Sequence, residues 1–363
     1  MSLKNYRLIY SVLKVIKNRK NDRFINSIIQ DDNIFRFQAA KNTLLPPSTK
    51  AYYLISYPWN TNGFFAIMRK IAESCIVADS FGFYPLINVE NSVYNVPNGY
   101  NSINNMFEYY FMPTSSLDFK DALENANCII SESIHLDKVR NILNANDTLP
   151  TYGVSEDYLH ILSEMVKRYF VLKPELSKEL NTEIFNLLGE KKTIAVHYRG
   201  TGWSRGLYGH PIPVKIEQCC AEVKRLLASG FEQVFLATDD LNAIEIMSSN
   251  FGSKLVFYRD VIRSKDNIEV QFSVNKREND GYYLGREVLR DMLTLASCQA
   301  LIAGLSQVSF FARIQKEALG QKFEYEKIIN NGVYTKRNLN SLLYRREVDK
   351  AAKMKIEKNK SIY

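Results

Sequence analysis

Short apolar runs alternate with amphipathic stretches through the second half of the chain. Four runs have the length and the Val, Ile, Leu, Phe and Ala content of buried strands: 193–198, 233–238, 254–258 and 300–304. Between and after them, apolar residues recur at the spacing of an amphipathic helix: 213–229, 241–250, 284–297 and 306–319. Strands that alternate with helices predict an α/β fold with a doubly wound parallel sheet.

The first half contains one clear unit of the same kind. A strand is predicted after the Pro46-Pro47 pair, and a polar turn, a helix and a second strand follow it: 51–56, 58–63, 64–81 and 85–89. Residues 91–150 predict loops with short helices, and 155–189 predict a helix interrupted at Pro174. The fold class expected from both halves is therefore α/β with two Rossmann-like domains.

Length agrees with this organisation, because 363 residues are enough for two domains. We predict an N-terminal α/β domain with a basic first helix, a C-terminal Rossmann-like domain and a basic helical tail: 1–188, 189–330 and 331–363. One face of the first helix collects Leu8, Ile9, Val12, Leu13 and Ile16. That helix suits either a membrane interface or a docking site on the protein body.

The net charge of +8 is concentrated at the two ends of the chain. Residues 1–23 carry seven basic side chains and one acidic side chain, and residues 345–363 carry seven and three. A nearly neutral body argues against a nucleic-acid-binding face, whereas the basic ends suit an anionic membrane surface. No apolar run reaches the ~18 residues of a membrane-spanning helix, and the first helix lacks the pattern of a signal peptide.

The cysteines and histidines exclude several kinds of site. The five cysteines are odd in number and include no C-x-x-C pair, and the four histidines show no metal-ligand spacing. This pattern indicates a reducing compartment, so we expect a cytoplasmic protein, peripheral to the inner face of a membrane, with no metal site. The sequence also lacks G-x-G-x-x-G, Walker and G-x-S-x-G motifs.

Polar residues gather directly after three predicted strands, where doubly wound sheets bind ligands. After 193–198, Arg199 offers a planar cationic fork to a phosphate. Gly200 and Gly202 would let backbone N–H groups approach the same anion. The alternative is a strand-to-loop turn with an ion-paired arginine.

The other two clusters also allow two interpretations. Asp239 and Asp240 follow 233–238 and suit either a metal site or the N-cap of the next helix. Ser306, with Gln307, follows 300–304 and suits either an anion at a helix N-terminus or an ordinary N-cap.

Asp291 is a candidate of another kind, because it lies between apolar residues inside the helix predicted over 284–297. A carboxylate in such a place needs a partner. A guanine base presents two parallel donors to one carboxylate, whereas the alternatives are a salt bridge or plain exposure.

In this order, the pieces resemble the alpha-1,6-fucosyltransferase superfamily, which includes the core fucosyltransferase of N-glycans and the rhizobial nodulation fucosyltransferase. The matching motifs are N-G-F-F-A at 62–66, a strand ending in H-x-R at 195–199, an H-P pair at 210–211, L-A-T-D-D at 236–240, the helical Asp291 and S-Q at 306–307. The resemblance covers roughly residues 50–320. It implies a GT-B-like glycosyltransferase whose first half binds the acceptor and whose second half binds a GDP-sugar.

The resemblance also implies a role for individual residues. Arg199 would bind the β-phosphate of the donor and support the leaving group, and His197 would line the nucleotide pocket. Asp291 would accept from the guanine edge. Ser306 and Gln307 would hold phosphate or the base-side loop. Asp239 and Asp240 would shape the site, since the family requires no metal.

One departure from the family concerns the general base, because no carboxylate occurs between Gly200 and Ile216. An inverting transfer needs a base for the proton of the acceptor hydroxyl. The candidates are His210, Asp239 and Asp240, and then Glu73 and Asp79.

The resemblance as a whole implies transfer of fucose from GDP-fucose to a glycan, in the synthesis of a bacterial surface polysaccharide or lipid-linked glycan. The alternatives are a transferase for another GDP-sugar and an inactive relative that binds a nucleotide or a glycan.

Overall fold

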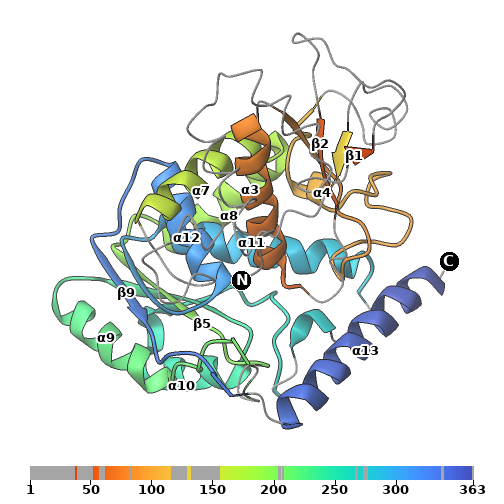
Figure 1. Ribbon diagram of the computed structural model, residues 1–363. Helices are drawn as coiled ribbons and strands as arrows, with labels where there is room; N and C mark the ends of the chain where they lie inside the picture. Colours follow the sequence, from red (N-terminus) through yellow and green to blue (C-terminus); the bar gives the residue numbers. More distant parts are fainter. Residues whose placement is uncertain are drawn as a thin grey trace.

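The computed structural model describes the chain in several ranges: 37–38, 52–56, 62–81, 83–115, 129–131, 156–202, 206, 208–265, 269–272, 277–336 and 339–361. The predicted first helix lies outside the described residues. Two sheets and their helices make up the fold (Figure 1). The predicted α/β class, with two sheets of mainly parallel strands, is confirmed.

The larger sheet has five strands, all paired in parallel, in the order β7-β6-β5-β8-β9. Their bounds are β5 Thr193–Tyr198, β6 Gln233–Thr238, β7 Leu255–Val256, β8 Ala300–Gly304 and β9 Tyr325–Ile329. Residues of β5, β6 and β8 are buried on both faces, which explains why these strands are continuous apolar runs. The chain continues from β5 to β6 on one side and resumes with β8 on the other, so the strand order reverses between β5 and β8.

Helices cover both faces of this sheet. Alternate strand residues such as Val196 and Leu236 pack with α9 (Ile216–Ala228) and α10 (Leu241–Phe251). The intervening residues, such as Ala195 and Phe235, pack with α11 (Asp280–Ser297) and α12 (Gln307–Ala318). The carboxyl ends of β5, β6 and β8 therefore meet at one edge, beside the N-termini of these helices.

The smaller sheet has the order β1-β4-β2-β3, in which β2 is parallel to β3 and β4, and β1 is antiparallel to β4. Its strands are β1 Phe37–Gln38, β2 Tyr52–Ile55, β3 Tyr84–Ile87 and β4 Ile129–Ser131. Helix α3 (Phe64–Phe81) connects β2 to β3, as the sequence predicts. Within the described residues, the other helices of this half are α4 Phe107–Tyr110, α7 Glu156–Tyr169 and α8 Pro174–Leu188.

Helix α11 binds the two halves together. The hydroxyl of Tyr110 donates to the backbone oxygen of Tyr282 at 2.8 Å. Arg286 and Arg290 of α11 both form ion pairs with Glu183 of α8. One hydrophobic cluster runs through residues of both halves. The domain boundaries at 188 and 330 remain a prediction.

Several elements differ from the predicted ones for identifiable reasons. The strand predicted over 254–258 shortens to β7, because a 3₁₀ turn at Gly252–Lys254 precedes it. Helix α11 begins four residues before 284, after Asn279 in the left-handed region. Strand β9 was not predicted, because it lies at the sheet edge and exposes part of its length. The basic tail contains α13 (Leu339–Ser361), which is drawn in dark blue at the end of the chain in Figure 1.

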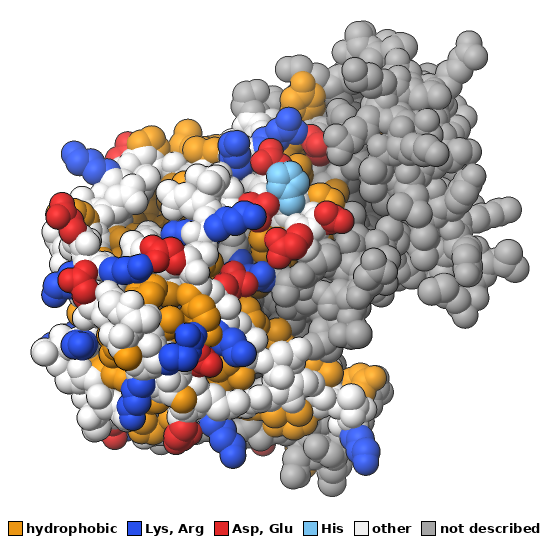
Figure 2. Space-filling model, turned by 90° about the vertical axis from the view of Figure 1, so that its left-hand side faces the viewer, with side chains coloured by type: hydrophobic (Ala, Val, Ile, Leu, Met, Phe, Trp, Pro, Cys, Tyr) orange, Lys and Arg blue, Asp and Glu red, His pale blue; other side chains and the backbone are white. Residues whose placement is uncertain are grey.

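The surface drawn in Figure 2 carries basic and acidic side chains side by side, without a large area of one sign. Among the described residues, no helix is both long and apolar enough to cross a membrane. Within the same part of the chain, Cys75, Cys219, Cys220 and Cys298 are free and buried, and no group of three His, Cys, Asp or Glu side chains is placed to hold a metal ion.

Candidate active site

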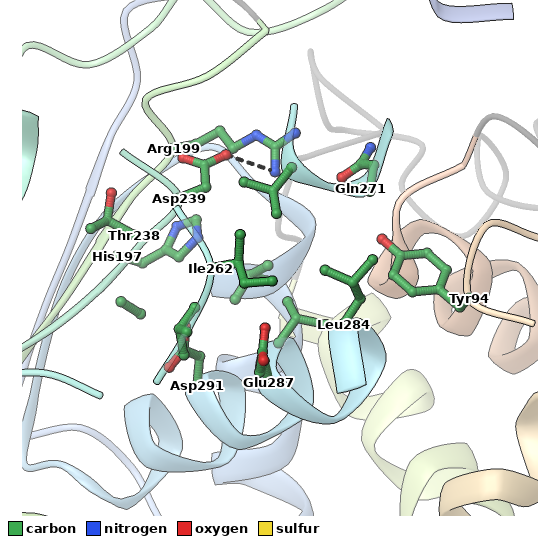
Figure 3. Close-up of a pocket in the computed structure, with 15 residues that line it drawn as sticks. Tyr94, His197, Arg199, Thr238, Asp239, Ile262, Gln271, Leu284, Glu287 and Asp291 are labelled. Atoms are coloured by element: carbon green, nitrogen blue, oxygen red, sulfur yellow. Dashed lines mark ion pairs between the residues drawn. The ribbon is translucent and has the colours of Figure 1, made fainter. Parts of the chain in front are cut away.

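A pocket opens at the edge of the sheet where β5 and β6 end. Its walls come from both halves of the chain: Tyr94 belongs to the first half, and Arg199, Asp239 and Asp291 belong to the second (Figure 3). It encloses about 620 Å³ of empty space, part of it open to solvent. Clefts that bind small molecules usually fall between ~300 and ~1,000 Å³.

Two carboxylates hold Arg199 at this pocket. Its guanidinium lies 3.1 Å from an oxygen of Asp239 and 3.1 Å from an oxygen of Glu269. Burial opposes the charge of Arg199, but the two carboxylates outweigh it and raise the pKa of the side chain. A guanidinium carries five N–H donors, so it can contact carboxylates and a further anion at once. The site therefore holds a permanent, oriented cation.

Asp239 is fully engaged in this arrangement. Besides Arg199, it accepts from the backbone N–H of Gly200 at 2.9 Å and from the hydroxyl of Thr201 at 2.5 Å. The expectation that the N–H of Gly200 faces a bound anion is therefore wrong for this structure, because the Asp239 carboxylate already takes that donor. Asp239 fixes the loop after β5.

Gly202 is required by the packing of this loop. Its φ of +79° lies in the left-handed region, and a Cβ there would lie 2.6 Å from Cγ of Glu269. Any side chain at this position would push Glu269 away from Arg199. Gly209 has a similar φ of +77°, but a Cβ there would meet nothing within 4 Å.

This difference gives a testable prediction. Gly202→Ala should destabilise the protein by more than the ~1–2 kcal/mol that the left-handed backbone alone costs, because overpacking adds about 1–3 kcal/mol. Gly209→Ala is the matched control and should show the backbone cost alone. Chemical denaturation of both variants measures the difference, and equal losses would contradict the packing of Gly202 against Glu269.

Asp291 and His197 also line this pocket (Figure 3). Asp291 is 8% exposed, and its Oδ1 has no hydrogen-bond partner. Burial raises the pKa of Asp291 to about 7, against the attraction of Arg263 and Arg290. His197 is buried with its Nδ1 unpartnered, and burial lowers its pKa to about 4, so its ring is neutral at pH 7. Two buried polar groups that line this pocket therefore lack hydrogen-bond partners.

Arg263 supports the part of the pocket wall that the loop after β7 forms. Its guanidinium donates to the backbone oxygens of Thr238 at 3.1 Å, Val261 at 3.0 Å and Tyr258 at 2.7 Å. These bonds fix the loop after β7 against the end of β6. Val261 and Ile262 of that loop line the pocket.

Other predicted site residues lie around this pocket. Ser306 accepts from the backbone N–H of Val308 as the N-cap of α12. It also lines a second cavity of about 280 Å³ together with His197 and Arg199. Gln307 is the first residue of α12. The structure thus supports the N-cap interpretation of Ser306 and also places it beside the arginine.

The remaining candidates are held elsewhere. Asp240 accepts from the backbone N–H of Asn242 at 2.9 Å, which is the N-cap interpretation. His210 lies in a turn whose backbone oxygen accepts from Tyr334 at 3.0 Å, and it lines neither cavity. Glu73 bonds the hydroxyl of Tyr158, and Asp79 pairs with Arg168, so both belong to the packing of α3 on α7.

Three groups that line the pocket or contact Arg199 were missed by the sequence analysis. Glu269 supplies the carboxylate that the loop between Gly200 and Ile216 lacks, but it comes from a segment about 70 positions away and belongs to no motif. Tyr94 belongs to a loop of the first half, where its hydroxyl accepts from the backbone N–H of Phe64 at 2.9 Å. Glu287 lies one turn before Asp291 on α11, and that helical spacing was the available signal for it.

The chain matches no protein-family model and no curated protein. It is similar to solved structures of fucosyltransferase NodZ from Bradyrhizobium, with a TM-score of 0.46, 15% identity, and 74% of this chain and 93% of that chain covered. It is also similar to POFUT1 in complex with GDP, with a TM-score of 0.44, 10% identity, and 78% and 99% covered.

Proposed function

We propose that the chain is an inverting, metal-independent glycosyltransferase that moves fucose from GDP-fucose to a hydroxyl group of a glycan. One observation carries the proposal: the buried, unpartnered carboxylate of Asp291 lies across the same pocket from the carboxylate-held guanidinium of Arg199. The carboxylate of Asp291 suits a nucleobase that presents hydrogen-bond donors, and the guanidinium of Arg199 suits a diphosphate.

The base side of the pocket favours guanine. Guanine presents an N–H and an amino group side by side, and a carboxylate accepts both in parallel. Adenine and cytosine present one donor beside an acceptor at that edge, and uracil presents its donor between two acceptors. His197, neutral at pH 7, adds one acceptor nitrogen to the same pocket.

The phosphate side then supports the departure of GDP. In the proposed step, the acceptor oxygen forms a bond to the anomeric carbon of fucose as the bond from that carbon to the β-phosphate oxygen breaks. The electron pair leaves with GDP, and a base takes the proton of the acceptor hydroxyl. Arg199 stabilises the charge that develops on the β-phosphate, because its orientation is fixed before the reaction.

The carboxylates at Arg199 are the proposed source of the base. Asp239 already accepts from Gly200, Thr201 and Arg199, which favours a positioning role. Glu269, on the other side of the guanidinium, is therefore proposed as the base ahead of Asp239 and of His210, which lines neither cavity. Since Asp239 is engaged and Asp240 caps α10, neither is proposed as a metal ligand.

The basic ends of the chain support a proposed acceptor and a proposed location for the protein. We place the acceptor in bacterial surface polysaccharide or lipid-linked glycan synthesis, with the protein in the cytoplasm at the inner face of a membrane. Basic residues of α13 such as Lys353, which is 74% exposed, are available to an anionic surface. The alternative donor is another GDP-sugar, because the residues around the sugar are not assigned.

Thermal-shift titrations with GDP, UDP, CMP and ADP test the proposal. A ligand that binds only the native state stabilises it by about 2.7 kcal/mol at one hundred times its dissociation constant. We expect a concentration-dependent rise of the unfolding temperature with GDP alone. A larger rise with UDP or CMP would overturn the guanine assignment. If GDP binds, turnover of GDP-fucose compared with that of GDP-mannose separates the two donors.

A further inference from the structure

The C-terminal helix α13 is attached to the body of the protein through apolar residues, Val348, Ala351 and Ala352, and through one buried lysine. Lys355 is only 3% exposed, whereas Lys353 on the same helix is 74% exposed. The ammonium of Lys355 donates to the backbone oxygen of Gln271 at 3.1 Å and lies 3.1 Å from the carboxylate of Asp280. In Figure 1 α13 lies along one side of the molecule, next to a short helical turn. Burying a charged ammonium group costs free energy, and these two contacts offset part of that cost.

Both contacts of Lys355 lead to the donor pocket. Gln271 belongs to the short turn η3 (Val270–Phe272), and Val270 and Gln271 line the pocket. Glu269, which directly precedes this turn, holds Arg199 through an ion pair at 3.1 Å. The backbone oxygen that Lys355 binds is therefore two residues away from the carboxylate that orients the proposed catalytic arginine.

The second contact continues as a row of alternating charges. Asp280, at the start of α11, also accepts from Arg277 at 3.2 Å. Arg277 forms an ion pair with Glu287, which lines the pocket one turn before Asp291. Lys355 thus ends a row of four groups that runs from α13 to the base side of the pocket.

We propose that Lys355 is a positioning residue, which holds the 269–272 segment and the first turn of α11 against the donor pocket from the C-terminal helix. The assignment of this pocket to a GDP-sugar rests on the proposed function, whereas the attachment of the segment does not. Binding of the GDP-sugar then depends on α13, although none of the side chains of α13 that the structure describes lines the pocket.

Lys355→Met tests this role, because methionine keeps much of the apolar length of the side chain and removes its hydrogen-bond donor. Lys353→Met is the matched control on the same helix. We expect roughly tenfold weaker GDP binding for Lys355→Met, because a segment that is held in the binding arrangement only about a tenth of the time lowers the apparent affinity by that factor, and no change for Lys353→Met. Hydrogen exchange at the amides of 270–272 should accelerate only in Lys355→Met.

The outcomes separate positioning from plain stability. A structural role alone would lower the unfolding temperature of Lys355→Met and leave both the GDP affinity and the exchange at 270–272 at the wild-type level, which would overturn the proposal. If Lys355→Met does not fold, Lys355→Gln, which keeps one donor, is measured in its place under the same criteria. If the wild type binds no GDP, the proposed function fails, and the exchange at 270–272 alone still decides whether Lys355 holds the segment.

Discussion

Arg199→Lys should lower the rate of fucosyl transfer by a factor of about 10²–10³, the usual loss when one preorganised donor to a developing negative charge is removed. Lysine keeps the positive charge but has a single ammonium in place of the planar fork. It cannot reach Asp239, Glu269 and a phosphate with the geometry that the guanidinium allows. The measurement is kcat for GDP-fucose at saturating donor.

Arg199→Ala should abolish measurable transfer, but it is the less informative variant. The side chains of Asp239 and Glu269 are only 16% and 10% exposed, so removal of the arginine leaves two buried carboxylates without their cation. Breaking a buried ion pair in this way costs about 3–5 kcal/mol. Arg199→Ala is therefore expected to lose stability as well as activity.

A matched control separates the two effects. Arg225→Lys changes an arginine that pairs with Glu222 on α9 and whose side chain is 55% exposed, and it should leave transfer unchanged. If Arg199→Lys retained wild-type kcat while folding normally, Arg199 would have no part in the chemical step.

Asp291→Asn should weaken GDP binding by one to two orders of magnitude, because a hydrogen bond to a charged group contributes about 1.5–3 kcal/mol. The amide offers one acceptor oxygen, and its NH₂ group opposes the donors of guanine. Isothermal titration with GDP measures the loss, and titration with UDP is the control, since it should remain weak in both proteins. An unchanged dissociation constant for GDP would remove Asp291 from the site.

The same substitution should alter the pH dependence of binding. Because the pKa of Asp291 is raised to about 7, the carboxylate that guanine needs is present above pH 7 and is lost as the pH falls through 7. Affinity for GDP should therefore fall roughly tenfold from pH 8 to pH 6 in the wild type. The phosphate of GDP titrates in both proteins, so the difference between wild type and Asp291→Asn isolates the carboxyl group.

Stability should change in the opposite direction. The pKa of Asp291 is higher in the folded state than the ~3.9 of an unfolded chain, so ionisation of this group destabilises the folded protein. That cost is absent below pH 4, grows as the pH rises to about 7 and stays constant above it. Asp291→Asn should therefore unfold at a higher temperature than the wild type at pH 8, with the difference narrowing toward pH 5.

These opposite effects are typical of a binding site. A buried carboxylate without a partner lowers the stability of the free protein, and it persists where a ligand supplies the missing donors. If Asp291 served only the stability of the protein, removal of its charge would not be expected to raise the unfolding temperature of the protein.

Central strands and long helices were predictable from the sequence. Strands β5, β6 and β8 match the predicted runs because both of their faces are covered, so most of their residues are apolar. Helix α3 matches because its buried face repeats at helical spacing. Edge strand β9 was missed, since a half-exposed strand carries a mixed pattern. Asp291 was found because a carboxylate among apolar positions of a helix breaks the expected pattern.

The sequence by itself determined the α/β class, the central strands and the polar residues that follow them, because burial and helical or strand periodicity act on neighbouring residues. Only the tertiary structure decided which distant groups meet. Glu269 reaches Arg199 from a separate segment, and Lys355 reaches Gln271 from the last helix. Such contacts depend on how the segments pack in three dimensions, and no spacing along the chain encodes that arrangement.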